Sequence, residues 1–190
     1  MQRHILTGAP GAGKTVLLRA LEQAGFAVVE EAATDLIALV TARGVAEHWK
    51  EPAFIDGVVA LQVQRQRRAD AWPDELVFFD RSPICTWALC EFSGQAPPEA
   101  LKAEVRRIER EGIYERAVFF VRGLGFITLT EARRIGLEDA SRFEAIHADV
   151  YRRFGFELID VPPCDVATRL AMVIDTVANH REKSGKTQTS

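Results

Sequence analysis

The sequence predicts an α/β protein in which helices cover both faces of a parallel β-sheet. Short apolar segments alternate with helical patterns along the 190 residues. Two of these segments, residues 76–79 and 117–121, are continuous apolar runs, as is typical of strands buried on both faces. A glycine-rich loop directly follows the first segment. This alternation favours five parallel strands that are joined by helices within one domain.

The glycine-rich loop, residues 8–15, matches the phosphate-binding pattern G-x-x-x-x-G-K-S/T in full. Its backbone N–H groups surround phosphate oxygens, its lysine reaches the β- and γ-phosphates, and its hydroxyl is a Mg²⁺ ligand. Residues 3–6 predict a strand before this P-loop, and residues 16–21 a helix whose N-terminus faces the anion. We therefore expect bound ATP with Mg²⁺, and GTP is not excluded. The predicted nucleotide-binding residues are Gly8, Ala9, Pro10, Gly11, Ala12, Gly13, Lys14, Thr15 and Val16.

The next elements are separated by glycine and proline. A strand is expected at residues 27–30, and Gly44 and Pro52 separate helices at 31–43 and 53–70. After the strand at 76–79, we expect helices near 83–93 and 98–111, a strand at 117–121, a looser stretch at 122–136, a helix over about 137–154, a strand at 157–161 and a helix at 165–180.

Apolar residues at three- and four-residue steps indicate the helix over 137–154, and His147 on its apolar face is interpreted as a packed core side chain. Residues 181–190 contain no apolar residue and are expected to form a disordered tail. Residues 1–180 would then be a single P-loop NTPase domain.

The composition fits a compact cytoplasmic protein. Its hydrophobic fraction is 47%, and no apolar run reaches the roughly 18 residues of a membrane span. The first strand begins at once, which leaves no room for a signal peptide. The cysteines have neither metal-ligand nor C-x-x-C spacing and are expected to be reduced. With a net charge of −3, no nucleic-acid partner is expected, and the oligomeric state stays open.

Ligands of parallel sheets bind at the carboxyl ends of the strands, so the residues after each strand are candidate site residues. Asp80 and Arg81 follow the apolar run at 76–79. Asp80 is placed to hold Mg²⁺ together with Thr15, as a Walker B aspartate does. A helix N-cap is the alternative interpretation of Asp80. Arg81 is a candidate to bind a substrate anion or to stabilise the transferred phosphate.

Two adjacent acids, Glu30 and Glu31, stand at the carboxyl end of the strand expected at 27–30. One of them could be a general base or a ligand for the attacking hydroxyl of a substrate. Glu31 is the better candidate because the small residues Ala32 and Ala33 leave access to the cleft. Alternatively, both acids complement the dipole of the following helix.

The segment 122–142 is rich in arginine, and we interpret it as a lid that closes on the phosphates. Arg133 and Arg134 are the candidates for this contact. Ordinary surface arginines near a helix start are the alternative.

The motifs GAPGAGKT, VVEEAA, FFDRSP, TEARRIGLEDA and YRRFGFELIDVPP, in this order, resemble a set of largely uncharacterised bacterial P-loop AAA-like ATPases. That set is similar to the ribosylnicotinamide-kinase domain of the bacterial NAD regulator, and more distantly to nucleoside and nucleotide kinases. The resemblance covers nearly all of residues 3–180. It implies a three-layer P-loop NTPase sandwich with strand order 2-3-1-4-5. Family members often have an arginine at the position of Thr34 and a glycine at the position of Ser82. This chain therefore lacks the arginine that would hold a substrate anion at position 34.

The resemblance and the motifs together predict a kinase that transfers the γ-phosphoryl group of ATP to a small hydroxyl-bearing acceptor, such as a nucleoside-like metabolite. Thr15 and Asp80 would place the metal, and Glu31 would orient or deprotonate the acceptor. The predicted catalytic residues are Lys14, Glu31, Asp80, Arg133 and Arg134. Two alternatives stay open: an NTP-binding switch that signals to a partner protein, and an ATPase that acts on a macromolecule.

Overall fold

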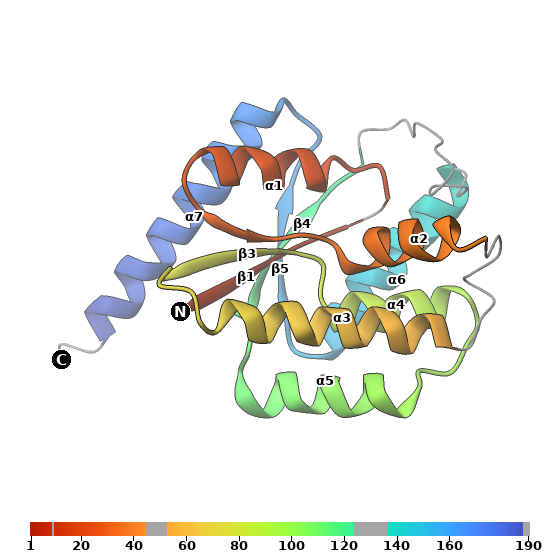
Figure 1. The fold of residues 1–190 in the computed structure, drawn as a ribbon. Coiled ribbons are helices and arrows are strands. Elements are labelled where there is room, and N and C mark those ends of the chain that lie inside the picture. The colour runs from red at the N-terminus through yellow and green to blue at the C-terminus, as the bar shows by residue number, and fades with distance from the viewer. Residues whose placement is uncertain (9, 45–52, 124–136, 188–190) are drawn as a thin grey trace.

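A five-stranded parallel sheet forms the centre of the protein. The structure, a computed structural model, describes residues 1–8, 10–44, 53–123 and 137–187. The strands are β1 (Gln2–Thr7), β2 (Ala27–Val29), β3 (Leu76–Asp80), β4 (Ala117–Val121) and β5 (Glu157–Val161). They lie in the order β2-β3-β1-β4-β5, and every pair is parallel (Figure 1). The predicted α/β class and strand order are confirmed.

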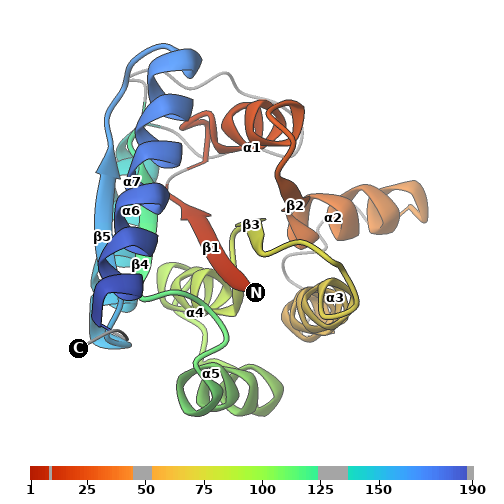
Figure 2. The same cartoon turned by 90° about the vertical axis from the view of Figure 1, so that its left-hand side faces the viewer.

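Helices cover both faces of this sheet, which makes three layers (Figure 2). In the described residues the helices are α1 (Lys14–Gln23), α2 (Ala32–Ala42), α3 (Ala53–Ala69), α4 (Pro83–Phe92), α5 (Glu99–Glu111), α6 (Leu137–Arg153) and α7 (Val166–Thr187). One core cluster joins α1 and α7 to one face of the sheet, and a second joins the other face to α3, α4, α5 and α6. None of the described helices has the length and apolar character needed to span a membrane.

The central strands supply side chains to both core clusters because successive residues of a strand point to opposite faces. Ile5 packs into the cluster with α3 to α6, whereas Leu6 packs into the cluster with α1 and α7. Val77 and Phe78 on β3 divide in the same way. The continuous apolar runs in the sequence therefore reflect burial on both faces, as predicted.

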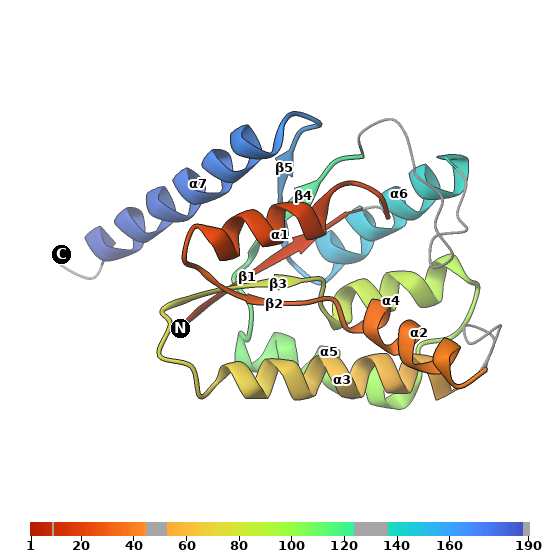
Figure 3. The same ribbon diagram turned by 45° about the horizontal axis from the view of Figure 1, so that its top comes forward.

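The carboxyl ends of β1 and β3 point to the side of the molecule where α1, α2 and α4 begin (Figure 3). The register explains this, since Leu6 near the end of β1 lies opposite Asp80 at the end of β3 and opposite Phe119 on β4. Residues that follow these strands are therefore neighbours in space, although they lie far apart in the chain.

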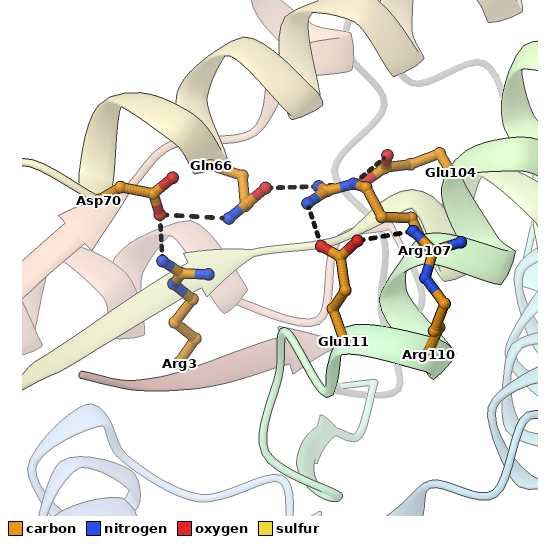
Figure 4. Close-up of polar contacts among 7 residues, drawn as sticks. All are labelled: Arg3, Gln66, Asp70, Glu104, Arg107, Arg110 and Glu111. Carbon is orange, nitrogen blue, oxygen red and sulfur yellow. Dashed lines mark hydrogen bonds and ion pairs between the residues drawn. The ribbon is translucent and has the colours of Figure 1, made fainter.

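A polar network joins the amino end of β1 to α3 and α5 (Figure 4). Arg3 pairs with Asp70, and Asp70 accepts a hydrogen bond of 3.4 Å from Gln66. The side-chain oxygen of the buried Gln66 accepts from Arg107 at 2.6 Å, and Arg107 also pairs with Glu104 at 2.8 Å. This network lies near the amino end of β1, whereas the P-loop follows the carboxyl end of the same strand. We therefore assign the network a structural role.

The last helix is longer than predicted. The sequence prediction ended this helix at residue 180 and left 181–190 disordered, but α7 continues to Thr187. Arginine, glutamate and lysine are good helix formers, so a helix that has already begun needs no apolar residue to continue. Arg181 also pairs with Glu75 at 2.5 Å. The polar composition therefore indicates an exposed helix end, which extends beyond the sheet (Figure 1).

Candidate functional site

The P-loop joins the end of β1 to the start of α1. Gly8, Gly11 and Gly13 have positive φ values of 127°, 82° and 87°, which glycine adopts without steric cost. A Cβ atom on Gly8 would overlap the carbonyl oxygen of Val121 at the end of β4. Glycine is therefore required at position 8 both by the backbone conformation and by the close approach to β4. Ala9 lies outside the described residues.

Lys14 is the first residue of α1, and its side chain is buried. Its Nζ atom donates a hydrogen bond of 3.1 Å to the carbonyl oxygen of Gly8. Burial and the nearby Arg81 lower the pKa of Lys14 to about 8, although Asp80 and Glu31 oppose the shift. The ammonium group is therefore shielded from water, and a bound anion would stabilise its charge.

Thr15 and Asp80 are in contact across the sheet edge. The Thr15 hydroxyl donates a hydrogen bond of 3.1 Å to Oδ2 of Asp80. Oδ1 of Asp80 is also buried, and it has no hydrogen-bond partner among the described residues. Burial and the Glu31 carboxylate raise the pKa of Asp80, against the opposing effect of Lys14. A hydroxyl beside a carboxylate with an unpartnered oxygen fits the oxygen ligands that Mg²⁺ prefers.

The N-cap of α4 is Ser82, so the N-cap interpretation of Asp80 is wrong.

Glu31 faces the same edge and pairs with Arg81, whose Nε atom lies 2.5 Å from Oε1. Thr34 donates a hydrogen bond of 2.6 Å to Oε2 of Glu31. Burial alone would raise the pKa of Glu31, but the charges of Arg81 and Lys14 outweigh it and lower the pKa overall. Glu31 is also the N-cap residue of α2, but its side chain makes no capping hydrogen bond. By contrast, Glu30 points away and pairs with Arg19.

Arg81 has a strained backbone, with the only positive φ (72°) among the described residues other than glycine. Its backbone N–H donates a hydrogen bond of 2.9 Å to the carbonyl oxygen of Leu6, which joins the ends of β1 and β3. Burial opposes the charged form of Arg81, but the Cys85 sulfur, Glu31 and Asp80 raise its pKa above the ordinary value. Strain of this kind is concentrated at functional sites.

Four further residues lie at this site and were not predicted there from the sequence: Ser82, Cys85, His147 and Tyr151. Nη1 of Arg81 lies 2.9 Å from Sγ of Cys85 and 3.3 Å from Nε2 of His147. The hydroxyls of Ser82 and Tyr151 are 2.8 Å apart and join the start of α4 to α6. His147 is fully buried, as predicted, but it contacts the site as well as the core. The available signal was the four-residue step from His147 to Tyr151, which places these two side chains on one face of α6.

Arg169 on α7 also was not identified. Its guanidinium donates to the carbonyl oxygens of Ala12 at 2.6 Å, Pro162 at 2.9 Å and Arg122 at 3.3 Å. These carbonyls belong to the P-loop and to the residues that follow β5 and β4. Arg169, which is buried, therefore holds three segments of the sheet edge together.

The remaining candidate residues lie at the rim or outside the described structure. Val16 is 60% exposed, directly after Thr15. In the predicted lid-like segment 122–142, Arg122 pairs with Glu144 and Asp160. Arg133 and Arg134, the candidates for phosphate contact, lie outside the described residues.

A narrow pocket lies between β2, β3 and α3, beside the Glu31–Arg81 pair. It is lined by residues that include Glu30, Gln62, Asp80 and Arg81.

The sheet order, the P-loop and the contact between Thr15 and Asp80 define a P-loop protein with a kinase-like fold. A family model with the description "AAA domain" matches residues 3–169. The chain belongs to this family.

Solved structures support the same fold. A deoxyadenosine kinase from M. mycoides, with dCMP and dCDP bound, is similar with a TM-score of 0.62 at 13% identity, over 94% of this chain and 100% of that chain. The same enzyme with bound dATP has a TM-score of 0.55. The NadR protein in complex with NAD and AMP-PNP has a TM-score of 0.67 at 18% identity, and the match covers 94% of this chain and 49% of that one. No curated protein matches this chain.

Proposed function

We propose that the protein binds ATP with Mg²⁺ and transfers the γ-phosphoryl group to a small hydroxyl-bearing acceptor, such as a nucleoside-like metabolite. One observation carries this proposal: a P-loop lysine, the Thr15–Asp80 contact and the Glu31–Arg81 pair meet at one edge of the sheet. The first two would hold a triphosphate and its metal, and the third lies where an acceptor would approach. The fold similarity to a deoxyadenosine kinase and to NadR with AMP-PNP agrees with this assignment.

Each residue of the site would have a separate task. Lys14 would stabilise charge on the β- and γ-phosphates, while Thr15 and Asp80 would hold Mg²⁺, which neutralises the charge that develops during transfer. The lowered pKa of Glu31 makes it a weak base but a good hydrogen-bond acceptor. We therefore propose that Glu31 orients the acceptor hydroxyl.

A screen of nucleosides, sugars and vitamins for ATP-dependent phosphorylation tests the proposal. Asp80→Asn should abolish Mg²⁺-dependent transfer and leave folding largely intact, because the change is nearly isosteric. Glu31→Gln should reduce transfer strongly with little effect on ATP binding. Glu99→Gln is the control, because this acid lies in the first turn of α5, pairs with Lys102 on the surface and should be close to wild type in activity.

If the wild-type protein binds ATP tightly but phosphorylates no acceptor and hydrolyses almost none of the nucleotide, the kinase proposal is wrong. That result would favour the nucleotide-dependent switch. Hydrolysis that only a macromolecule stimulates would instead favour an ATPase that acts on that macromolecule.

A further inference from the structure

The guanidinium of Arg81 contacts two buried side chains on different helices, at the nitrogen Nη1. Sγ of Cys85, on α4, lies 2.9 Å from Nη1 of Arg81. Nε2 of His147, on α6, lies 2.6 Å from this sulfur and 3.3 Å from the same Nη1. The exposed fraction is 3% for Cys85 and 0% for His147. The opposite side of the guanidinium, at Nε, faces Glu31.

The second ring nitrogen of His147 defines the direction of these hydrogen bonds. Nδ1 lies 2.9 Å from the carbonyl oxygen of Phe143, and a carbonyl can only accept, so Nδ1 carries the proton. Burial and the charge of Arg81 lower the pKa of His147 to about 3, which keeps the ring neutral. Nε2 is then an acceptor, and the thiol of Cys85 donates to it. The sulfur in turn accepts from Nη1 of Arg81.

This arrangement disfavours a nucleophilic role for Cys85. A cysteine–histidine pair acts as a nucleophile when the imidazole takes the thiol proton. The buried ring of His147 lies next to a guanidinium, and a second positive charge there would be unfavourable. The geometry instead leaves a sulfur lone pair to accept from the arginine, while the lone pair of Nε2 accepts from the thiol.

We propose that Cys85 and His147 are positioning residues that hold the Arg81 guanidinium against Glu31. The proposal rests on the proposed function, in which Arg81 and Glu31 face the acceptor. Arginine has a long side chain with much rotamer freedom, and small displacements of positioned groups slow an enzyme strongly. The hydrogen bond between Ser82 and Tyr151 joins the same two helices one residue beyond Arg81, so the α4–α6 contact supports the position of the guanidinium.

Kinetics of three cysteine variants test the proposal, with an acceptor identified in the phosphorylation screen. Cys85→Ala removes both contacts and should lower kcat/KM for the acceptor by about tenfold or more, while the Kd for ATP stays within about twofold. Cys85→Ser keeps a donor and an acceptor at this position and should recover most of the loss. Cys90→Ala is the matched control, because Cys90 is equally buried on α4 and lies in the same core cluster. The Cys90→Ala protein should be less stable than the wild type, but its kcat/KM for the acceptor should be close to the wild-type value.

A double-variant cycle separates positioning of Arg81 from a general effect on the fold. In an Arg81→Met background, Cys85→Ala should have almost no further effect on kcat/KM, because the group that it positions is absent. Additive losses would overturn the proposal, as would a Cys90→Ala variant with the same kinetic profile as Cys85→Ala.

Nuclear magnetic resonance provides a readout that does not require an acceptor. In the free protein, the Nη1–H protons of Arg81, which donate to the Cys85 sulfur, should exchange with water about tenfold faster in Cys85→Ala than in the wild type or Cys90→Ala. The ¹⁵N shifts of His147 should identify Nε2 as the unprotonated nitrogen. Unchanged exchange in Cys85→Ala would overturn the positioning role even in an active enzyme. If no acceptor is found but exchange accelerates as expected, the proposed function fails and the positioning of Arg81 stands.

Discussion

The ammonium group of Lys14 is buried at the first turn of α1, where its position follows from the left-handed conformation of Gly13. Burial lowers the pKa of Lys14 to about 8, because the group has lost most of its water. Phosphate oxygens would compensate for this loss. Binding of the nucleotide and protonation of the Lys14 amine are therefore coupled.

Lys14→Ala should weaken ATP binding by roughly 10- to 100-fold, since a hydrogen bond to a charged group contributes about 1.5–3 kcal/mol. Titration with a fluorescent ATP analogue measures the change. Lys102→Ala is the control, because Lys102 is a surface lysine that pairs with Glu99 on α5. Equal affinity in Lys14→Ala and in the wild type would show that the P-loop is not the nucleotide site.

The affinity for ATP should also depend on pH on the alkaline side. Below pH 8, Lys14 is protonated with and without nucleotide, so its contribution to affinity is constant. Above pH 8, the free protein loses this proton and must regain it on binding, so the affinity should fall by up to about tenfold per pH unit. Calorimetric titrations from pH 7.5 to 9.5 would detect the decline. In Lys14→Arg, whose guanidinium does not titrate in this range, the decline should disappear, and its persistence would assign it to another group.

At the scale of elements, the site depends on how the ends of strands and helices meet. Arg169 on α7 donates to carbonyl oxygens in the P-loop, after β4 and after β5, so the P-loop and the start of the segment 122–142 share one anchor. Arg122, at the start of that segment, is itself held by ion pairs with Glu144 on α6 and Asp160 on β5. These contacts hold the start of the segment 122–142 against α6, α7 and β5.

Replacing Arg133 and Arg134 together with alanine should lower kcat by about 10²-fold or more, because an arginine that stabilises the transition state contributes about 10³ to 10⁵ in rate. The Kd for ATP should change much less, since the contact would form mainly during transfer. Steady-state kinetics and ATP titration of the double variant measure both quantities. The exposed pair Arg67 and Arg68 on α3 is the matched control.

Parallel losses in ATP binding and in rate would mean that Arg133 and Arg134 hold ATP directly. Wild-type values for both would assign them to the ordinary surface. Hydrogen exchange adds a further measurement, because the segment 122–136 should become more protected when nucleotide and acceptor are both present.

At the scale of the whole molecule, two buried histidines make folding sensitive to acid. His4 on the central strand stacks on Phe78, and neither of its ring nitrogens has a hydrogen-bond partner among the described residues. Burial, together with the nearby His180, lowers the pKa of His4 to about 4. His147 is shifted in the same direction. Both rings are neutral in the folded protein, whereas the unfolded chain protonates them near pH 6.5.

The contribution of these two histidines to the free energy of unfolding should therefore be nearly constant above about pH 7.5 and fall as the pH decreases toward 4, because only the unfolded chain gains these protons. His4 alone should account for roughly 2 kcal/mol of this loss between pH 7 and pH 5. Urea denaturation of the wild type and of His4→Phe at both pH values measures this share. Phenylalanine preserves a ring beside Phe78 and cannot titrate, so the variant should show a shallower pH dependence. An identical slope in both proteins would contradict the assignment.

Much of the fold could be predicted from local patterns. The apolar runs at β3 and β4 predict strands because burial on both faces leaves no polar position. The P-loop is contiguous, so its function is carried by eight neighbouring residues and needs no tertiary information to be recognised. Asp80 and Arg81 could be chosen because parallel strands bring their carboxyl ends to one edge. The predicted end of the last helix, at residue 180, was wrong, because a polar composition does not by itself indicate disorder.

Only the tertiary structure brought Cys85, His147 and Arg169 to the site. Each lies on a helix whose sequence is explained by core packing alone, and no local spacing relates Cys85 to a histidine 62 residues away. The contact exists because α4 and α6 pack on the same face of the sheet. Likewise, Arg169 reaches Ala12, 157 residues earlier, because α7 packs beside α1. The sequence by itself determined the phosphate-binding loop and the order of elements, since both depend on neighbouring residues. The packing of helices decided how Arg81 is held, since that contact depends on residues that meet only in the folded chain.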